Sequence, residues 1–256
     1  LIISTNSDVR KEVLHKFLKL NKVKNIIFEK IVFTNLKDYK NTIKILNQKK
    51  IKSYINFPRR IYPFYIKLKN DLDKKKNLSY TLIGSNWGFA TNSIHNIDLF
   101  LFLTNSKNIF SQYLTISRVS KSKKRNEFLD INASLSLKTK ENHNLFLNDY
   151  FTNKKVKNKL NGPIKIETID KSYFIYENLN FVIEIDNKKL KIKKYKIDLP
   201  KQSILTAKIL INFKKNNNIK LTTLAEGLIS HKVLINSLSK ELVKINNKYK
   251  NNLPIT

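Results

Sequence analysis

Short apolar strands that alternate with amphipathic helices are the feature that most restricts the fold of this 256-residue chain. The strand-like segments fall at residues 1–5, 24–30 and 51–58, and the helices at 6–20, 34–46 and 62–75. Ser7 is a plausible N-cap of the first helix, and Thr34 is the expected N-cap of the second. Parallel strands need a crossover connection, usually a helix, to return the chain to the same edge of the sheet. The spacing therefore predicts βαβ units and a parallel sheet covered on both faces.

The pattern changes after the lysine-rich residues 73–77. A strand at 78–87 and a helix at 90–105 are followed by a series of β-branched and aromatic segments up to residue 198. Two helices close the chain, and the second begins with a capping box, Thr223 to Glu226. We therefore expect an α/β domain over 1–72 and an α+β domain over 73–256 with a mixed or antiparallel open sheet flanked by helices.

A formal net charge of +31 raises the possibility of nucleic-acid binding. Arginine reads phosphate and guanine with two parallel hydrogen bonds, yet the chain holds only five arginines among its 50 basic residues. The lysines are spread along the whole sequence without a basic tail. We therefore expect no specific nucleic-acid partner, although a lysine-rich polyanion-binding protein stays open as the alternative.

Several sequence features that the chain lacks restrict the class of protein to which it can belong. No apolar run approaches the length of a membrane span, so we expect no membrane partner. The chain has no cysteine and no signal-like start, which fits a cytoplasmic protein. It also has no methionine and opens directly on a strand, so we expect a fragment whose N-terminal part is missing.

Polar residues follow the second and third predicted strands. Glu29 and Lys30 stand just past the carboxyl end of the second strand, the edge at which open α/β sheets bind ligands. Arg59 and Arg60 follow the third strand and reach the same edge, where they could bind phosphate or a polar substrate. Both pairs could equally be ordinary loop residues.

His95 and Asp98 lie three residues apart on one face of an otherwise apolar helix. Polar groups are costly in a buried element unless they are paired or used. The pair can be a structural core contact or an acid–base group. A metal site would need further ligands, which the chain does not offer nearby, so we expect no metal.

The order of these motifs resembles the glucose–fructose oxidoreductase and inositol dehydrogenase family, Gfo/Idh/MocA. "STNS" at 4–7 is similar to the family's strand ending in Thr, then Pro or another residue, then Ser, and "FEK" at 28–30 is similar to its later Glu-Lys-Pro. "NSIHNIDLFLFLT" at 92–104 is similar to the family's Asn-x-x-His-x-x-Asp helix. The helix that begins at Thr223 is similar to the family's late helix that carries a histidine. Ile31 departs from the family's proline, and Thr91 from an aspartate that several members carry.

This resemblance implies that residues 1–72 are the C-terminal half of a Rossmann-type domain and that the cofactor is NAD or NADP. Lys30 would hydrogen-bond the reacting hydroxyl, His95 would move its proton, and Asp98 would orient His95. The remaining implied contacts are Thr5, Asn6 and Glu29 with the cofactor, and Arg59, Arg60, Trp87 and Asn92 with the substrate.

The phosphate-binding loop of that fold is absent, since the only glycines are Gly84, Gly88, Gly162 and Gly227. The resemblance implies an oxidoreductase for a sugar, nucleotide sugar or cyclitol that forms a homo-oligomer through its C-terminal sheet. An inactive fragment that binds no cofactor is a further alternative.

Overall fold

The computed structural model describes residues 1–72, 75–123, 125–152, 161–215, 220–250 and 253–256. Their contacts divide the chain into two compact units. Unit 1 comprises residues 1–61, 121–129 and 201–256, and unit 2 comprises residues 62–120 and 130–200. This division differs from the predicted boundary at residue 72, because the two C-terminal helices pack with the N-terminal strands.

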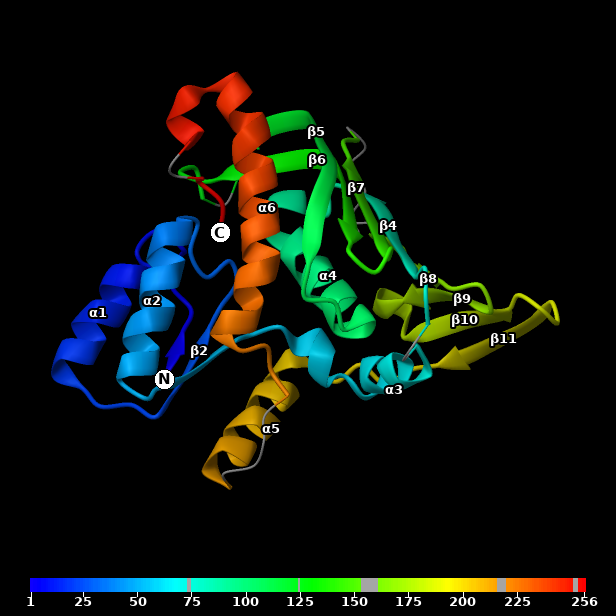
Figure 1. Ribbon diagram of the computed structural model, residues 1–256, viewed down its shortest axis with the longest axis horizontal. Coiled ribbons are helices and arrows are strands. Elements are labelled where there is room, and N and C mark those ends of the chain that lie inside the picture. Colours follow the sequence, from blue (N-terminus) through cyan, green and yellow to red (C-terminus); the bar gives the residue numbers. More distant parts are fainter. Residues whose placement is uncertain (73–74, 124, 153–160, 216–219, 251–252) are drawn as a thin grey trace. The chain divides into compact units, whose positions relative to one another are not determined.

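Unit 1 is built on a three-stranded parallel sheet in the order β1 (Ile2–Ile3), β2 (Asn25–Phe28) and β3 (Lys52–Ile55). The helices α1 (Arg10–Leu20) and α2 (Leu36–Gln48) connect the strands (Figure 1). This confirms the predicted βαβ units. The described part of β1 lies at one edge of the sheet.

The helix α6 (Leu224–Ile245) belongs to unit 1 and packs against β3 and α2. Thr223 and Glu226 form both hydrogen bonds of the predicted capping box. Gly227 permits the close approach, since a Cβ at this position would collide with the Ile55 side chain. The helix α5 (Gln202–Lys214) adds Ile209 to a small buried cluster with Ile27 and Leu221.

Unit 2 is built on an eight-stranded sheet in the order β11-β10-β9-β8-β4-β7-β6-β5. β4 pairs in parallel with β7 and antiparallel with β8, so the predicted mixed sheet is confirmed. The bounds are β4 Ser79–Ser85, β5 Ile109–Lys121, β6 Leu129–Thr139, β7 Asn144–Tyr150, β8 Asn161–Glu167, β9 Lys171–Tyr176, β10 Phe181–Asp186 and β11 Lys191–Lys196.

Two helices of unit 2, α3 (Pro63–Leu72) and α4 (Phe89–Thr104), contact each other. α4 also packs on β7 and is buried over most of its length, as its apolar sequence predicts. Short 3-10 helices lie at Pro58–Ile61, Glu177–Leu179 and Asn247–Lys250. No helix in the described ranges is long and apolar enough to cross a membrane.

Two predicted helix caps are wrong. Ser7 does not cap α1, because its hydroxyl donates instead to the carbonyl of Ile255 at 2.7 Å. Thr34 does not cap α2, whose cap is the next residue, Asn35. The Asn35 side chain accepts from the backbone N–H groups of Lys37 and Asp38, as a helix N-cap requires.

Candidate functional site

Polar side chains collect at the carboxyl ends of the three parallel strands of unit 1. Thr5 and Asn6 follow β1, Glu29 and Lys30 follow β2, and Asn56 follows β3. The Nδ2 of Asn56 donates to the Glu29 carboxylate at 2.5 Å. Four of the expected residues, Thr5, Asn6, Glu29 and Lys30, therefore lie at one edge of the sheet. Open α/β folds bind ligands at this edge.

A buried arginine fixes the backbone of this edge. Arg10 is 1% exposed, and its guanidinium donates to the carbonyls of Glu29 at 2.8 Å and Val32 at 2.9 Å. It also donates to the carbonyls of Thr5 and Ile31. One side chain thus joins the turn after β1 to the turn after β2. The backbone positions of Thr5 and Lys30 are therefore fixed relative to each other.

A buried histidine of α6 holds the same turn from the other side. The backbone N–H of Val32 donates to Nε2 of His231 at 3.1 Å, so the proton of the neutral ring lies on Nδ1, which donates to the carbonyl of Gly227 at 2.7 Å. Complete burial lowers the pKa of His231 to about 4.

The peptide bond between Lys30 and Ile31 in this turn is cis. Ile31 is not a proline, in contrast to the proline that the resembling family has at this position.

The environment of Lys30 favours loss of its proton. Burial lowers the pKa of Lys30 to about 8, and the positive charges of Arg125 and Arg10 act in the same direction. The negative charge of Glu29 opposes them and raises this pKa. An amine with a pKa near 8 can both hold and release a proton close to neutral pH, as acid–base catalysis needs.

The second group of expected residues lies in unit 2, on and just before α4. His95 is partly buried and Asp98 is 1% exposed on this helix. Asn92 donates from Nδ2 to the carbonyl of Trp87 at 2.7 Å. Trp87 is 2% exposed and donates from its indole to the carbonyl of Asn148 at 2.9 Å, so this ring packs in the interior.

A buried carboxylate from β7 fixes the start of α4. Asp149 accepts from the backbone N–H groups of Trp87, Gly88 and Phe89 at 2.9–3.1 Å. It therefore caps α4 from another strand, because Gly88 at the N-cap has no side chain to do so. Burial raises the pKa of Asp149, and the three N–H donors oppose that shift. His95 stands less than two turns beyond this cap.

Arg59 and Arg60 lie in unit 1, in the 3-10 helix that follows β3, and both are partly exposed. The expected residues thus form two groups, one in each unit. Within the described ranges, no three His, Asp or Glu side chains gather to hold a metal ion.

Sequence reasoning assigned no positioning role to Arg10, Asn56, Asp149 or His231. Asn56 carried a usable signal, since it directly follows a parallel strand in the same way as Glu29, and His231 lies in the helix that resembles the family's late histidine helix. The partners of Arg10 and His231 are backbone groups in other parts of the chain, and such contacts leave no pattern in the sequence.

No protein-family model matches the sequence, and no curated protein sequence shows significant similarity to it. The fold is similar to solved structures of the Gfo/Idh/MocA type, which confirms the fold that the resemblance implies. A dehydrogenase (MviM) from Clostridium difficile is 17% identical with a TM-score of 0.65, over 94% of this chain and 78% of that one.

Two further structures show that one fold serves different roles. A UDP-N-acetylglucosamine 3-dehydrogenase from Acidithiobacillus ferrooxidans is 13% identical with a TM-score of 0.57, over 94% of this chain and 76% of that one. A super-repressor mutant of Gal80p from Saccharomyces cerevisiae is 12% identical with a TM-score of 0.70, over 95% of this chain and 77% of that one.

Proposed function

We propose that the protein is an NAD(P)-dependent oxidoreductase acting on a sugar, nucleotide sugar or cyclitol. The observation that carries the proposal is Lys30, whose pKa is lowered to about 8 beside Glu29 at the carboxyl end of a parallel strand. The solved structures named as dehydrogenases share this fold, although fold alone does not assign an activity.

The unit 1 edge suits the nicotinamide–ribose end of the cofactor. The Glu29 carboxylate can accept hydrogen bonds from ribose hydroxyls, and Thr5 and Asn6 stand beside it. The Thr5 hydroxyl is buried and lacks a partner among the described residues, so this turn holds unused hydrogen-bonding capacity. The chain has no glycine before Gly84, so its strand ends supply no phosphate-binding loop.

When bound, the nicotinamide would accept or return a hydride at a carbinol carbon of the substrate. Lys30 would donate a hydrogen bond from Nζ to the reacting oxygen and stabilise its developing negative charge. His95 would take the hydroxyl proton or return it, and Asp98 would orient its ring. Arg59, Arg60 and Asn92 stay as proposed substrate-binding residues, whereas the buried ring of Trp87 would support this region from the interior.

We further propose a cytoplasmic homo-oligomer that pairs through the open face of the unit 2 sheet. Apolar side chains lie exposed on that face, including Ile83 of β4 and Tyr150 of β7. Size-exclusion chromatography with light scattering tests it: Ile83→Lys should shift an oligomer toward the monomer, whereas a wild-type monomer would contradict the proposal.

The first test of function is cofactor binding, measured by NADH and NADPH fluorescence on wild type and Glu29→Ala. We expect saturable binding that Glu29→Ala weakens. The second test measures turnover of a panel of sugars and cyclitols by wild type, Lys30→Met and His95→Gln. Each variant should lose about 100- to 1,000-fold in kcat, as removal of one proton carrier or charge stabiliser does. Lys240→Met, on exposed α6 surface, is the matched control.

Full turnover by Lys30→Met would contradict the catalytic role. Failure to bind either nucleotide would favour the inactive fragment. The second candidate function is polyanion binding, which the formal net charge of +31 favours. It predicts salt-sensitive binding to DNA or heparin that the Lys30→Met, His95→Gln double variant retains.

A further inference from the structure

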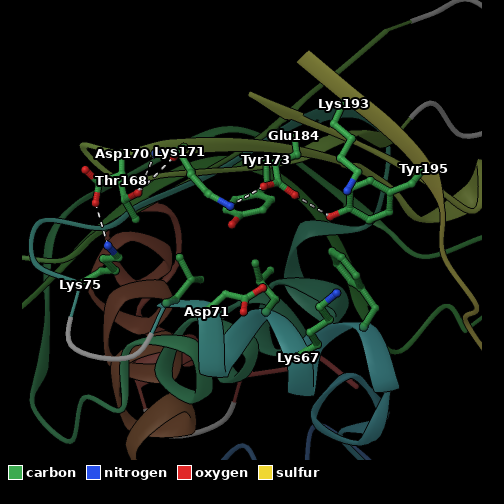
Figure 2. Close-up of a pocket in the computed structure, with 13 residues that line it drawn as sticks. Lys67, Asp71, Lys75, Thr168, Asp170, Lys171, Tyr173, Glu184, Lys193 and Tyr195 are labelled. Atoms are coloured by element: carbon green, nitrogen blue, oxygen red, sulfur yellow. Dashed lines mark hydrogen bonds and ion pairs between the residues drawn. The ribbon is translucent and has the colours of Figure 1, made fainter. Parts of the chain in front are cut away.

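Unit 2 contains a cavity of about 530 Å³ that the proposed reaction does not use. It lies between α3 and the strands β9, β10 and β11 (Figure 2). Its volume falls in the range of ligand-binding clefts in proteins. The lining residues are Phe64, Lys67, Leu68, Asp71, Leu72, Lys75, Thr168, Asp170, Lys171, Tyr173, Glu184, Lys193 and Tyr195.

The sheet wall of this cavity is polar at a position where a covered sheet is normally apolar. Tyr173, Glu184 and Lys193 are direct cross-strand neighbours on β9, β10 and β11, and all three line the cavity. The neighbouring row on the same face contains Ile175 and Val182, which are fully buried. Glu184 therefore stands on the helix-facing side of the sheet, where an unsupported carboxylate would be costly.

Two donors support Glu184. Lys171 Nζ lies 2.5 Å from one carboxylate oxygen, and the Tyr195 hydroxyl donates to the other at 3.2 Å (Figure 2). Asp71 of α3 lines the same cavity, where burial and the negative charges of Glu184 and Asp71 raise the pKa of Tyr195. The cavity thus presents carboxylates and ammonium groups side by side.

Tyr173 has the one hydroxyl of the sheet wall that no described residue binds. The residue is 2% exposed, its pKa is raised by burial and by Glu184 and Asp71, and no hydrogen bond reaches its hydroxyl from the described residues. Figure 2 shows this phenol pointing into the cavity. This hydroxyl oxygen is not one of the buried polar atoms that lack a partner, so it is open to the cavity, where it can bind a ligand atom or water.

The charges select the class of ligand. Four lysines and three carboxylates line the cavity, and Lys75 is paired with Asp170 at 2.7 Å. An anion would face Asp71, and a cation would face Lys67 and Lys193. A neutral molecule with several hydroxyls avoids charge repulsion in both cases, because each hydroxyl can donate to a carboxylate and accept from an ammonium or phenol. The rings of Phe64, Tyr173 and Tyr195 add apolar surface.

We propose that this cavity is a binding site for a neutral polyhydroxylated ligand, a sugar or polyol, anchored by the Tyr173 hydroxyl and the Glu184 carboxylate. The site is independent of the proposed redox reaction. It requires only the residues of α3, β9, β10 and β11, so it holds even if the chain binds no nucleotide.

Ligand-observed saturation-transfer NMR and calorimetry on the whole chain test the proposal. The probes are D-glucose, myo-inositol and maltose, with inorganic phosphate and putrescine as the anionic and cationic comparisons. We expect at least one neutral probe to bind at least ten times more tightly than phosphate or putrescine. Tighter binding of either charged probe, or no binding of any neutral probe, would overturn the proposal.

Tyr173→Phe locates the site, because it removes only a hydroxyl that holds no hydrogen bond to the described protein. We expect about fivefold weaker binding of the neutral probe, the usual effect of one lost neutral hydrogen bond, and no decrease in melting temperature. Tyr176→Phe on the opposite face of β9 is the matched control and should bind as wild type does. Equal affinity of Tyr173→Phe and wild type would overturn the assignment to this cavity.

Discussion

Two lysines, one in each unit, have a neighbouring glutamate and opposite pKa shifts. Lys30 follows β2 beside Glu29, and its pKa is lowered to about 8. Lys171 begins β9 and lies 2.5 Å from Glu184, and its pKa is raised. The same pair of residue types therefore gives a lysine that releases its proton easily in one unit and one that keeps it in the other.

The difference comes from burial and from the surrounding charges. Lys30 is mostly removed from water, and Arg10 and Arg125 add like charges around it. The side chain of Lys171 is 42% exposed, and the hydrogen bond that it donates to Glu184 is the largest influence on its pKa. A neighbouring carboxylate raises the pKa of a lysine, but burial among other cations outweighs one carboxylate.

The largest expected effect comes from removing the arginine that holds the Lys30 turn. Arg10→Met leaves two buried and two partly buried carbonyls without this donor, at about 1–3 kcal/mol for each unsatisfied buried group, partly relieved by relaxation. We expect a loss of about 4 kcal/mol in the free energy of unfolding, measured by urea denaturation followed by circular dichroism. Arg118→Met, on an exposed strand, should cost under about 1 kcal/mol. Equal effects of the two variants would contradict a clamping role for Arg10.

The histidine on the other side of this turn gives a pH dependence. The folded state takes up a proton on His231 only near its lowered pKa of about 4, whereas the unfolded state takes it up near 6.5. The unfolded state thus binds more protons between these values, so stability falls as the pH is lowered through this window, by roughly 3 kcal/mol in all.

Urea denaturation of wild type and His231→Leu at several pH values between 4 and 7 measures this contribution. The variant should be less stable at pH 7, because the Val32 N–H and Gly227 carbonyl lose their partner. It should also show a shallower slope with pH. His15→Leu, at a partly buried position on α1, is the control, and an unchanged slope in His231→Leu would refute the assignment.

Amine acetylation with quantitative mass spectrometry compares the two lysines directly. The labelling rate of Lys30 should rise with a midpoint near pH 8, while that of Lys171 keeps rising above pH 10. Glu29→Gln should lower the Lys30 midpoint, since the Glu29 charge raises that pKa. Arg125→Gln should raise it. A Lys30 midpoint near 10.5 in wild type would remove the contrast.

The smallest effect is expected in the other unit. Lys171→Met breaks a partly exposed ion pair, and such pairs contribute about 0–1 kcal/mol. Thermal unfolding at low and high salt measures it, and the difference from wild type should shrink as salt screens the pair. A loss above about 2 kcal/mol would contradict this expectation, because it exceeds what a partly exposed ion pair contributes.

The local pattern of the sequence predicted most of the elements. Apolar runs and helical spacing identified the three parallel strands, and strand-end position identified Glu29 and Lys30. The strand β7 was not among the predicted segments, because Leu145, Phe146 and Leu147 form a short apolar run between polar residues and show no alternation. The N-caps of α1 and α2 were assigned to the wrong residues, because several adjacent residues can act as a helix N-cap.

The positioning residues could not be read from the sequence. Arg10 bonds carbonyls up to 22 residues away, and His231 bonds a backbone N–H 199 residues away. The same holds for the division into units, since α6 joins β3 across more than 160 residues. Long-range packing decides these contacts, whereas periodicity reports only which face of an element is buried.

The strand β11 limits how the unit 2 sheet can grow. It lies at one end of the sheet order, and Lys191, Lys193, Lys194 and Lys196 occupy four of its six positions. A second copy that added itself strand to strand there would bring eight ammonium groups together, and like charges at an open edge are a common barrier to such polymerisation. Fusion of two copies strand to strand along this edge is therefore disfavoured.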